Sequence, residues 1–145
     1  MYATATDMIA RFGETQILRL SNPEDLTATT VNVAKVNQAI ADATALIDGY
    51  LRKRYAVPVL APPVDLIAGC CKIARYELAQ GERTTPTEQM KTDRSDVMKW
   101  LEQISRGVVH LDAPLADGAT GQAIGSGPRY SDRPRDFDHT TLRDM

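Results

Sequence analysis

Apolar residues recur at helical spacing through the middle of the chain, three or four positions apart. They are Val33, Val36, Ile40, Ala43, Ile47 and Tyr50. Polar residues such as Lys35, Gln38 and Asp42 fall between them. This period predicts one long amphipathic helix. Gly49 interrupts the pattern at a cost of about 1 kcal/mol relative to Ala, so we expect a close contact with another helix at that position.

Two shorter helices are predicted before this segment. Thr6 is the expected N-cap of the first, because short side chains with an oxygen accept hydrogen bonds from the first turn. Gly13 is the expected end of that helix. One or two further helical turns are predicted after Gly13, and this second helix ends at residues 21–23, Ser-Asn-Pro. Residues 27–30 have a loop composition.

Two longer helices are predicted in the second half of the domain. Pro63 suits a first helical position, and the broadly apolar stretch after it, which we expect to be central, ends at Gly81. Thr85 and Glu88 have the spacing of a capping box that opens the last helix. Its apolar face is formed by Met90, Val97, Leu101 and Ile104. Gly107 is placed to end it.

The pattern changes after the last helix. Residues 108–111, "VVHL", predict a short strand. Beyond Leu111 the chain is rich in Gly, Pro, Asp, Ser and Thr. Its apolar residues show neither the helical nor the strand period. We therefore expect an all-α fold, a small bundle of four to five helices with a short strand, over residues 1–111. Residues 112–145 are expected to form a long extended arm that docks on a partner.

Composition narrows the class of protein. The net charge is −2, without the overall basic excess that non-specific DNA binding requires. Cys70 and Cys71 are adjacent, which disfavours a disulfide between them and favours a reducing compartment. We expect at least one of them to be a small core residue. No stretch approaches the roughly 18 to 20 apolar residues of a membrane span, so we expect a soluble protein made in the cytoplasm.

The sequence contains no arrangement of residues that indicates an enzyme. Ser126 in "AIGSGP" lacks the glycines that a nucleophile elbow needs on both sides. His110 and His139 have no second ligand at metal-binding spacing. Asp93 and Asp96 are interpreted as a solvated surface rather than an acid–base pair. We therefore expect no catalytic residue, cofactor or metal.

A basic cluster is the strongest candidate for a contact with nucleic acid. Arg52, Lys53 and Arg54 stand beside Tyr50 and Tyr55, and cations interleaved with aromatic rings suit single-stranded nucleic acid. Two other interpretations remain open. The cations can simply stabilise the C-terminal end of a helix, or they can form a subunit contact. Trp100 likewise suits either the core or an interface.

The arm carries apolar side chains at intervals. Tyr130, Phe137 and Leu142 are separated by Arg133, Arg135 and several aspartates. This pattern is typical of a segment that docks on a partner as an extended peptide. A purely solvated tail is the alternative.

Four ordered stretches resemble one family. They are "MYATATDMIARFG", "ALIDGYLRKRYAVPV", "VDLIAGCCKIARYELA" and "DVMKWLEQISRGVVHL". Over roughly residues 1–111 they look like the Mu-type head-tail adaptor, or head completion, proteins of tailed bacteriophages. The ending "RDFDHTTLRDM" is similar to that family's C-terminal signature.

The resemblance implies a structural virion protein without catalytic residues. It would assemble, usually as a twelve-membered ring, below the portal protein of a DNA-filled head and present a surface to a tail-terminator or stopper protein. Passive contact with genomic DNA in the channel would follow from that position. The alternative class is a small helical nucleic-acid-binding module that uses Arg52, Lys53 and Arg54.

Overall fold

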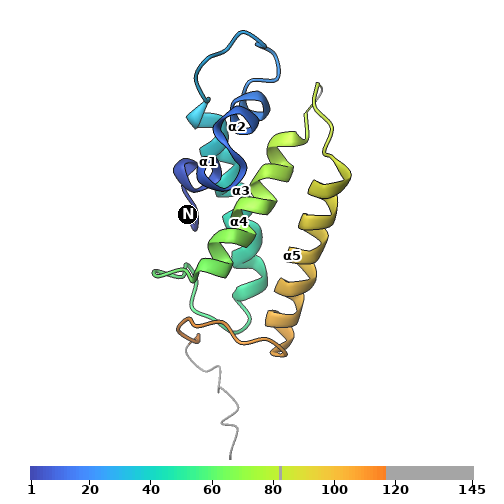
Figure 1. Ribbon diagram of the computed structural model, residues 1–145. Helices are drawn as coiled ribbons and strands as arrows, with labels where there is room; N and C mark the ends of the chain where they lie inside the picture. Colours follow the sequence, from blue (N-terminus) through green and yellow to red (C-terminus); the bar gives the residue numbers. More distant parts are fainter. Residues whose placement is uncertain (82, 117–145) are drawn as a thin grey trace, which may run out of the picture.

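The computed structural model describes residues 1–81 and 83–116, and within these ranges the fold is all-α. The helices are α1 (Ala5–Phe12), α2 (Glu14–Ser21), α3 (Val33–Leu51), α4 (Val64–Ala79) and α5 (Glu88–Arg106). The long helices α3, α4 and α5 lie side by side, and the short α1 and α2 cover one end of α3 and α4 (Figure 1). The central place expected for the helix after Pro63 is confirmed, since α4 packs against each of the other four.

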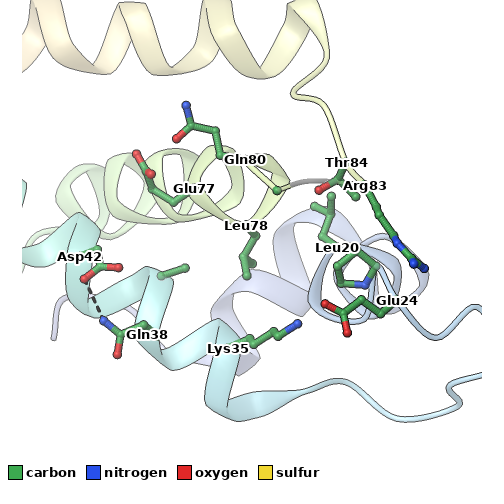
Figure 2. Close-up of a pocket in the computed structure, with 13 residues that line it drawn as sticks. Leu20, Glu24, Lys35, Gln38, Asp42, Glu77, Leu78, Gln80, Arg83 and Thr84 are labelled. Carbon is green, nitrogen blue, oxygen red and sulfur yellow. Dashed lines mark hydrogen bonds between the residues drawn. The ribbon is translucent and has the colours of Figure 1, made fainter.

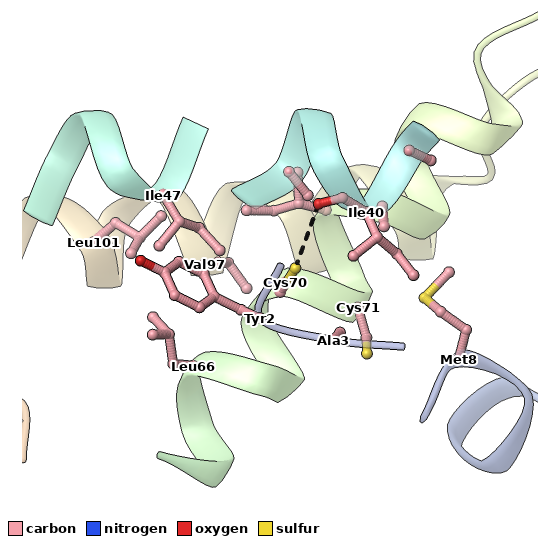
Figure 3. Close-up of a cluster of buried hydrophobic side chains, with 14 of the residues drawn as sticks. Tyr2, Ala3, Met8, Ile40, Ile47, Leu66, Cys70, Cys71, Val97 and Leu101 are labelled. Atoms are coloured by element: carbon pink, nitrogen blue, oxygen red, sulfur yellow. Dashed lines mark hydrogen bonds between the residues drawn. The ribbon is translucent and has the colours of Figure 1, made fainter. Parts of the chain in front are cut away.

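The core lies where the apolar spacing predicts it, except at Val33, which is 51% exposed in the first turn of α3. Val36, Ile40, Ala43 and Ile47 on α3 are almost completely buried, and so are Leu101 and Ile104 on α5. The core prediction for the cysteines is confirmed and extended, because Cys70 and Cys71 are both fully buried and free. Figure 3 shows them with Tyr2, Met8 and Leu66 between the helices.

Three helix starts differ from the predictions. Pro63 is the N-cap of α4 rather than its first residue, because the helix begins at Val64. The N-cap of α1 is Thr4 rather than Thr6, because Asp7 stands three residues after Thr4 and completes the reciprocal pair of hydrogen bonds of a capping box. The N-cap of α5 is Thr87, whose hydroxyl accepts from Met90 N–H at 3.3 Å. The predicted box at Thr85 is therefore wrong, since it lies before the helix.

The predictions made for glycine residues are confirmed at two positions and wrong at a third. Gly13 and Gly107 end α1 and α5 with φ of 86° and 80°, as expected. The close contact expected at Gly49 is wrong, because nothing lies within 4 Å of the position of an added Cβ. The close approach is at Gly69, where that atom would lie 3.3 Å from Cγ1 of Val97 and 3.6 Å from Cζ3 of Trp100.

The predicted strand at residues 108–111 is also wrong. The described residues contain only an isolated antiparallel bridge, between Tyr55 and Leu115. Leu111 N–H donates to the Tyr55 hydroxyl at 2.8 Å, so it does not enter a strand ladder. No helix in the described part of the chain is both long and apolar enough to span a membrane.

Tyr2 is a core residue that the periodicity does not indicate. Its ring is 3% exposed, and its hydroxyl donates to the Asp48 carboxylate and accepts from Val59 N–H at 3.1 Å. This residue therefore fixes the N-terminal segment to the end of α3 and to the loop that follows.

Burial, followed by the hydrogen bond to Asp48, raises the pKa of Tyr2 from 10.0 to about 12. We expect Tyr2→Phe to lower the free energy of unfolding at pH 7 by about 1 to 3 kcal/mol, because Val59 N–H loses its acceptor and Asp48 its donor. Folded Tyr2 holds its proton more tightly than unfolded Tyr2, so its stabilisation is complete below pH 10 and lost as the pH rises toward 12. Urea denaturation at increasing pH should therefore show the two proteins converging; a constant difference would contradict this.

Candidate interaction surfaces

The basic cluster is divided between two environments. Arg52 and Lys53 are exposed at the end of α3, whereas Arg54 is partly buried. The Arg54 guanidinium lies over Gly107, where an added Cβ would be 1.6 Å from its Nη1. This places a cation at the negative C-terminal end of α5, a favourable arrangement. Arg54 therefore packs within the bundle, and Arg52 and Lys53 remain available to a partner.

The aromatic part of the cluster is not available for base stacking. Tyr55 is 2% exposed and belongs to the core. Tyr50 is partly buried against that core. The geometry thus differs from the interleaved cations and exposed rings that bind single-stranded nucleic acid.

The segment after α5 is attached to this same end of the bundle (Figure 1). Ala56 N–H donates to the Pro114 carbonyl and Ala116 N–H to the Arg54 carbonyl, each at 3.0 Å. The first residues of the predicted arm therefore lie against residues 54–56. The predicted partner-binding residues Tyr130, Arg133, Arg135, Phe137 and Leu142 lie outside the described residues.

A partly buried ion pair joins three helices. Arg75 on α4 is 8% exposed, and its Nη2 lies 2.5 Å from Oδ2 of Asp93 on α5. Its guanidinium carbon lies 4.1 Å from the centre of the Phe12 ring on α1. The interpretation of Asp93 as solvated is therefore wrong, because it turns toward Arg75; Asp96 is exposed as expected. The sequence did carry a sign of this pair, because Arg75 is a charged residue among the apolar positions of α4.

A cavity of about 370 Å³ with a mixed polar and apolar lining lies between α2, α3 and the C-terminal end of α4. Figure 2 shows charges of both signs around it: Glu24, Lys35, Asp42, Glu77 and Arg83. Gln38 donates to the Asp42 carboxylate at 2.9 Å, and Leu20 and Leu78 form the apolar part. The mixed charges give this cavity no clear preference for an anion or a cation.

A metal site requires several ligating side chains close together. In residues 1–81 and 83–116, no group of three or more His, Cys, Asp or Glu side chains is placed to hold a metal ion. The thiols of Cys70 and Cys71 lie in the core, where burial raises the pKa of both, that of Cys71 to about 12. Such thiols are poor nucleophiles, because the thiolate is the reactive form.

A shallow groove of about 280 Å³ runs between α4 and α5. Its lining consists of Asp65, Ala68, Gly69, Lys72, Asp96, Val97 and Trp100. Trp100 satisfies both sequence interpretations, since it packs partly against the core and also lines this surface. Sequence reasoning did not find the groove, which exists only because α4 and α5 meet at Gly69.

The helical bundle with its attached C-terminal segment belongs to a phage family. The family described as "Bacteriophage Mu, Gp36" matches residues 2–126, which is most of the chain. The chain is therefore a member of the Gp36 family of bacteriophage Mu, and the Mu-type part of the resemblance is confirmed.

Two similar proteins come from a phage and a prophage. "Gene product J" of Escherichia phage Mu is 37% identical over 106 residues, which cover 73% of this chain and 72% of that protein. "Mu-like prophage FluMu protein gp36" of Haemophilus influenzae is 34% identical over 112 residues, covering 77% of this chain and 75% of that protein.

Proposed function

We propose that this chain is the head-tail adaptor of a Mu-type tailed phage, a structural virion protein that links the DNA-filled head to the tail. The observation that carries the proposal is its membership of the Mu Gp36 family. The helical bundle supports it, because the C-terminal segment leaves from one end, beside the exposed cations Arg52 and Lys53. This arrangement suits a protein that holds a partner with an arm.

In this proposal the protein lies in the neck of the virion. The copies form a ring below the portal protein, with twelve subunits as in the family that the sequence resembles, and the ring presents its other face to a tail-terminator or stopper protein. An arm repeated around a ring gains affinity through multivalency, so each docking contact can be small. Arg52 and Lys53 would face a neighbouring subunit or contact the genomic DNA passively.

The nucleic-acid-binding module is less well supported. Tyr55 is buried and Arg54 packs on Gly107, so the described part of the cluster offers two exposed cations. Affinity from so few phosphate contacts would be weak, because each neutralised phosphate adds to the affinity through counterion release. Salt-dependent retention of DNA by the purified chain would favour this alternative.

Removal of residues 129–145 is expected to abolish attachment to portal-bearing heads. The thermal stability of the bundle should change little, because the described core lies within residues 2–113. Docking of an extended segment costs about 1 to 2 kcal/mol of conformational entropy per ordered residue, so its apolar side chains must recover that cost. The measurement is the amount of chain retained on purified heads, with the melting temperature as the folding control.

Point variants separate docking by the apolar side chains from loss of chain length. Combined replacement of Tyr130, Phe137 and Leu142 by Ala should weaken attachment as truncation does. Replacement of Thr140 and Thr141 by Ala is the matched control and should leave it intact. Wild-type attachment by the truncated chain would show that the arm does not dock.

A further inference from the structure

Residues 1–3 lie over the core as an N-terminal strap. Tyr2 and Ala3 are each 3% exposed, whereas the residues on either side of them are exposed. The Tyr2 N–H donates to the Thr44 hydroxyl on α3 at 3.3 Å. The capping box that opens α1 starts at Thr4 and is complete without the strap. The strap can therefore leave the core without unwinding a helix.

The strap covers the thiol of Cys70 on α4. Thr44 Oγ1, which accepts from the Tyr2 N–H, lies 3.8 Å from the Cys70 sulfur. Burial raises the pKa of the Cys70 thiol, while the hydrogen bond with Thr44 and the backbone N–H groups of Tyr2 and Ala3 lower it. Figure 3 shows Tyr2 beside this thiol. While the strap is in place, Cys70 is shielded from reagents and held in its unreactive form.

The Tyr2 hydroxyl holds the strap to two other elements. It donates to the Asp48 carboxylate near the end of α3 and accepts from Val59 N–H in the α3–α4 loop at 3.1 Å. Within residues 1–81 and 83–116, this hydroxyl is the only hydrogen-bond acceptor of the Val59 N–H. Val59 is 5% exposed, but the next residue, Leu60, is 95% exposed. One hydroxyl thus links the strap to a loop whose tip is open to a partner.

We propose that the strap and the α3–α4 loop form a latch, which opens when Tyr2 leaves Asp48 and Val59 and uncovers Cys70 while α3, α4 and α5 stay folded. Local opening is favoured where few contacts break and a segment regains conformational freedom. A partner that engages Leu60 acts on the residue next to the latch, and it shifts the equilibrium if it binds one form better than the other. The inference goes beyond the proposed function and does not rest on it.

Thiol labelling of the folded protein tests the latch. In the full-length chain, Cys71→Ala leaves Cys70 as the single thiol. Its reaction with excess methyl methanethiosulfonate is followed by mass spectrometry at urea concentrations below the unfolding transition. The free energy of opening should fall with urea much less steeply than the free energy of global unfolding, because the slope scales with the surface exposed. Equal slopes would mean that Cys70 reacts only in the unfolded chain, and they would overturn the latch.

Two variants separate the latch from a general loss of stability. Added to Cys71→Ala, Tyr2→Phe keeps the ring and removes the hydroxyl, so the labelling rate of Cys70 should rise by about tenfold or more. Val36→Ala is the matched control at a fully buried residue near the start of α3. It destabilises the bundle through lost burial but leaves the latch intact, so the rate should hardly change. A similar rise in both variants would contradict the proposal.

A second probe needs no variant, and so decides the question even if Cys71→Ala does not fold. Opening of the latch frees the Val59 N–H, so its hydrogen exchange in the unmodified chain, measured by NMR, should depend on urea as weakly as the labelling of Cys70 does. The amide of Ile73, fully buried on α4, should exchange only with the steep slope of global unfolding. Steep exchange of Val59, or opening free energies that differ between Val59 and Cys70, would show that the strap and the loop do not open together.

Discussion

Replacement of Ile47 by Asp is expected to unfold the domain. Ile47 is fully buried on α3 and faces Leu101 and Val97 in the core (Figure 3). The substitution removes the apolar burial of a large side chain, about 1.5 to 3 kcal/mol. It also places an unpaired carboxyl group among apolar side chains, which costs several kcal/mol more. The sum approaches the total stability of a typical domain, about 5 to 15 kcal/mol.

Circular dichroism and thermal denaturation measure this effect. Ile47→Val is the conservative control and should cost about 0.5 to 1.5 kcal/mol. Ala45→Asp places the same carboxylate on the exposed face of the same helix and should leave the domain folded. If Ile47→Asp melts cooperatively within a few degrees of the wild-type protein, the packing of α3 against α4 and α5 is not as the structure has it.

Replacement of Asp93 by Ala is expected to be the most damaging change of a charged side chain. Arg75 is 8% exposed, so removal of its partner leaves a nearly buried guanidinium without its counter-charge. Breaking such a pair typically lowers the free energy of unfolding by about 3 to 5 kcal/mol. Gln89, which donates to Asp93 at 3.1 Å, loses its acceptor as well.

A double variant identifies the physical cause. Arg75→Met combined with Asp93→Leu removes both charges, and we expect it to recover most of the stability lost by Asp93→Ala. Asp96→Ala, one turn further along α5 and exposed, should change the free energy of unfolding by no more than about 0.5 kcal/mol. Chemical denaturation of the four proteins gives the comparison, and equal losses from Asp93→Ala and Asp96→Ala would refute the role of the pair.

The helices themselves could be predicted from the sequence, because their signals are local. The period of apolar residues between Val33 and Tyr50 reports one face of a helix, whatever that face packs against. Gly107 ends α5 because the left-handed φ at that position favours Gly. The N-caps were harder to place, since several threonines stand close together and only the geometry of the first turn selects Thr4 and Thr87. The family resemblance is likewise a property of the sequence alone.

The tertiary structure decided which distant residues meet, and local patterns carry little information about that. Tyr2 enters the core because Asp48 and Val59, more than forty residues away, satisfy its hydroxyl. The sequence grouped Arg54 with Arg52 and Lys53, and the structure separates it because α5 ends beneath it at Gly107. The groove beside Trp100 and the isolation of Leu60 likewise appear only when the helices pack, because both depend on the surfaces that packing leaves exposed.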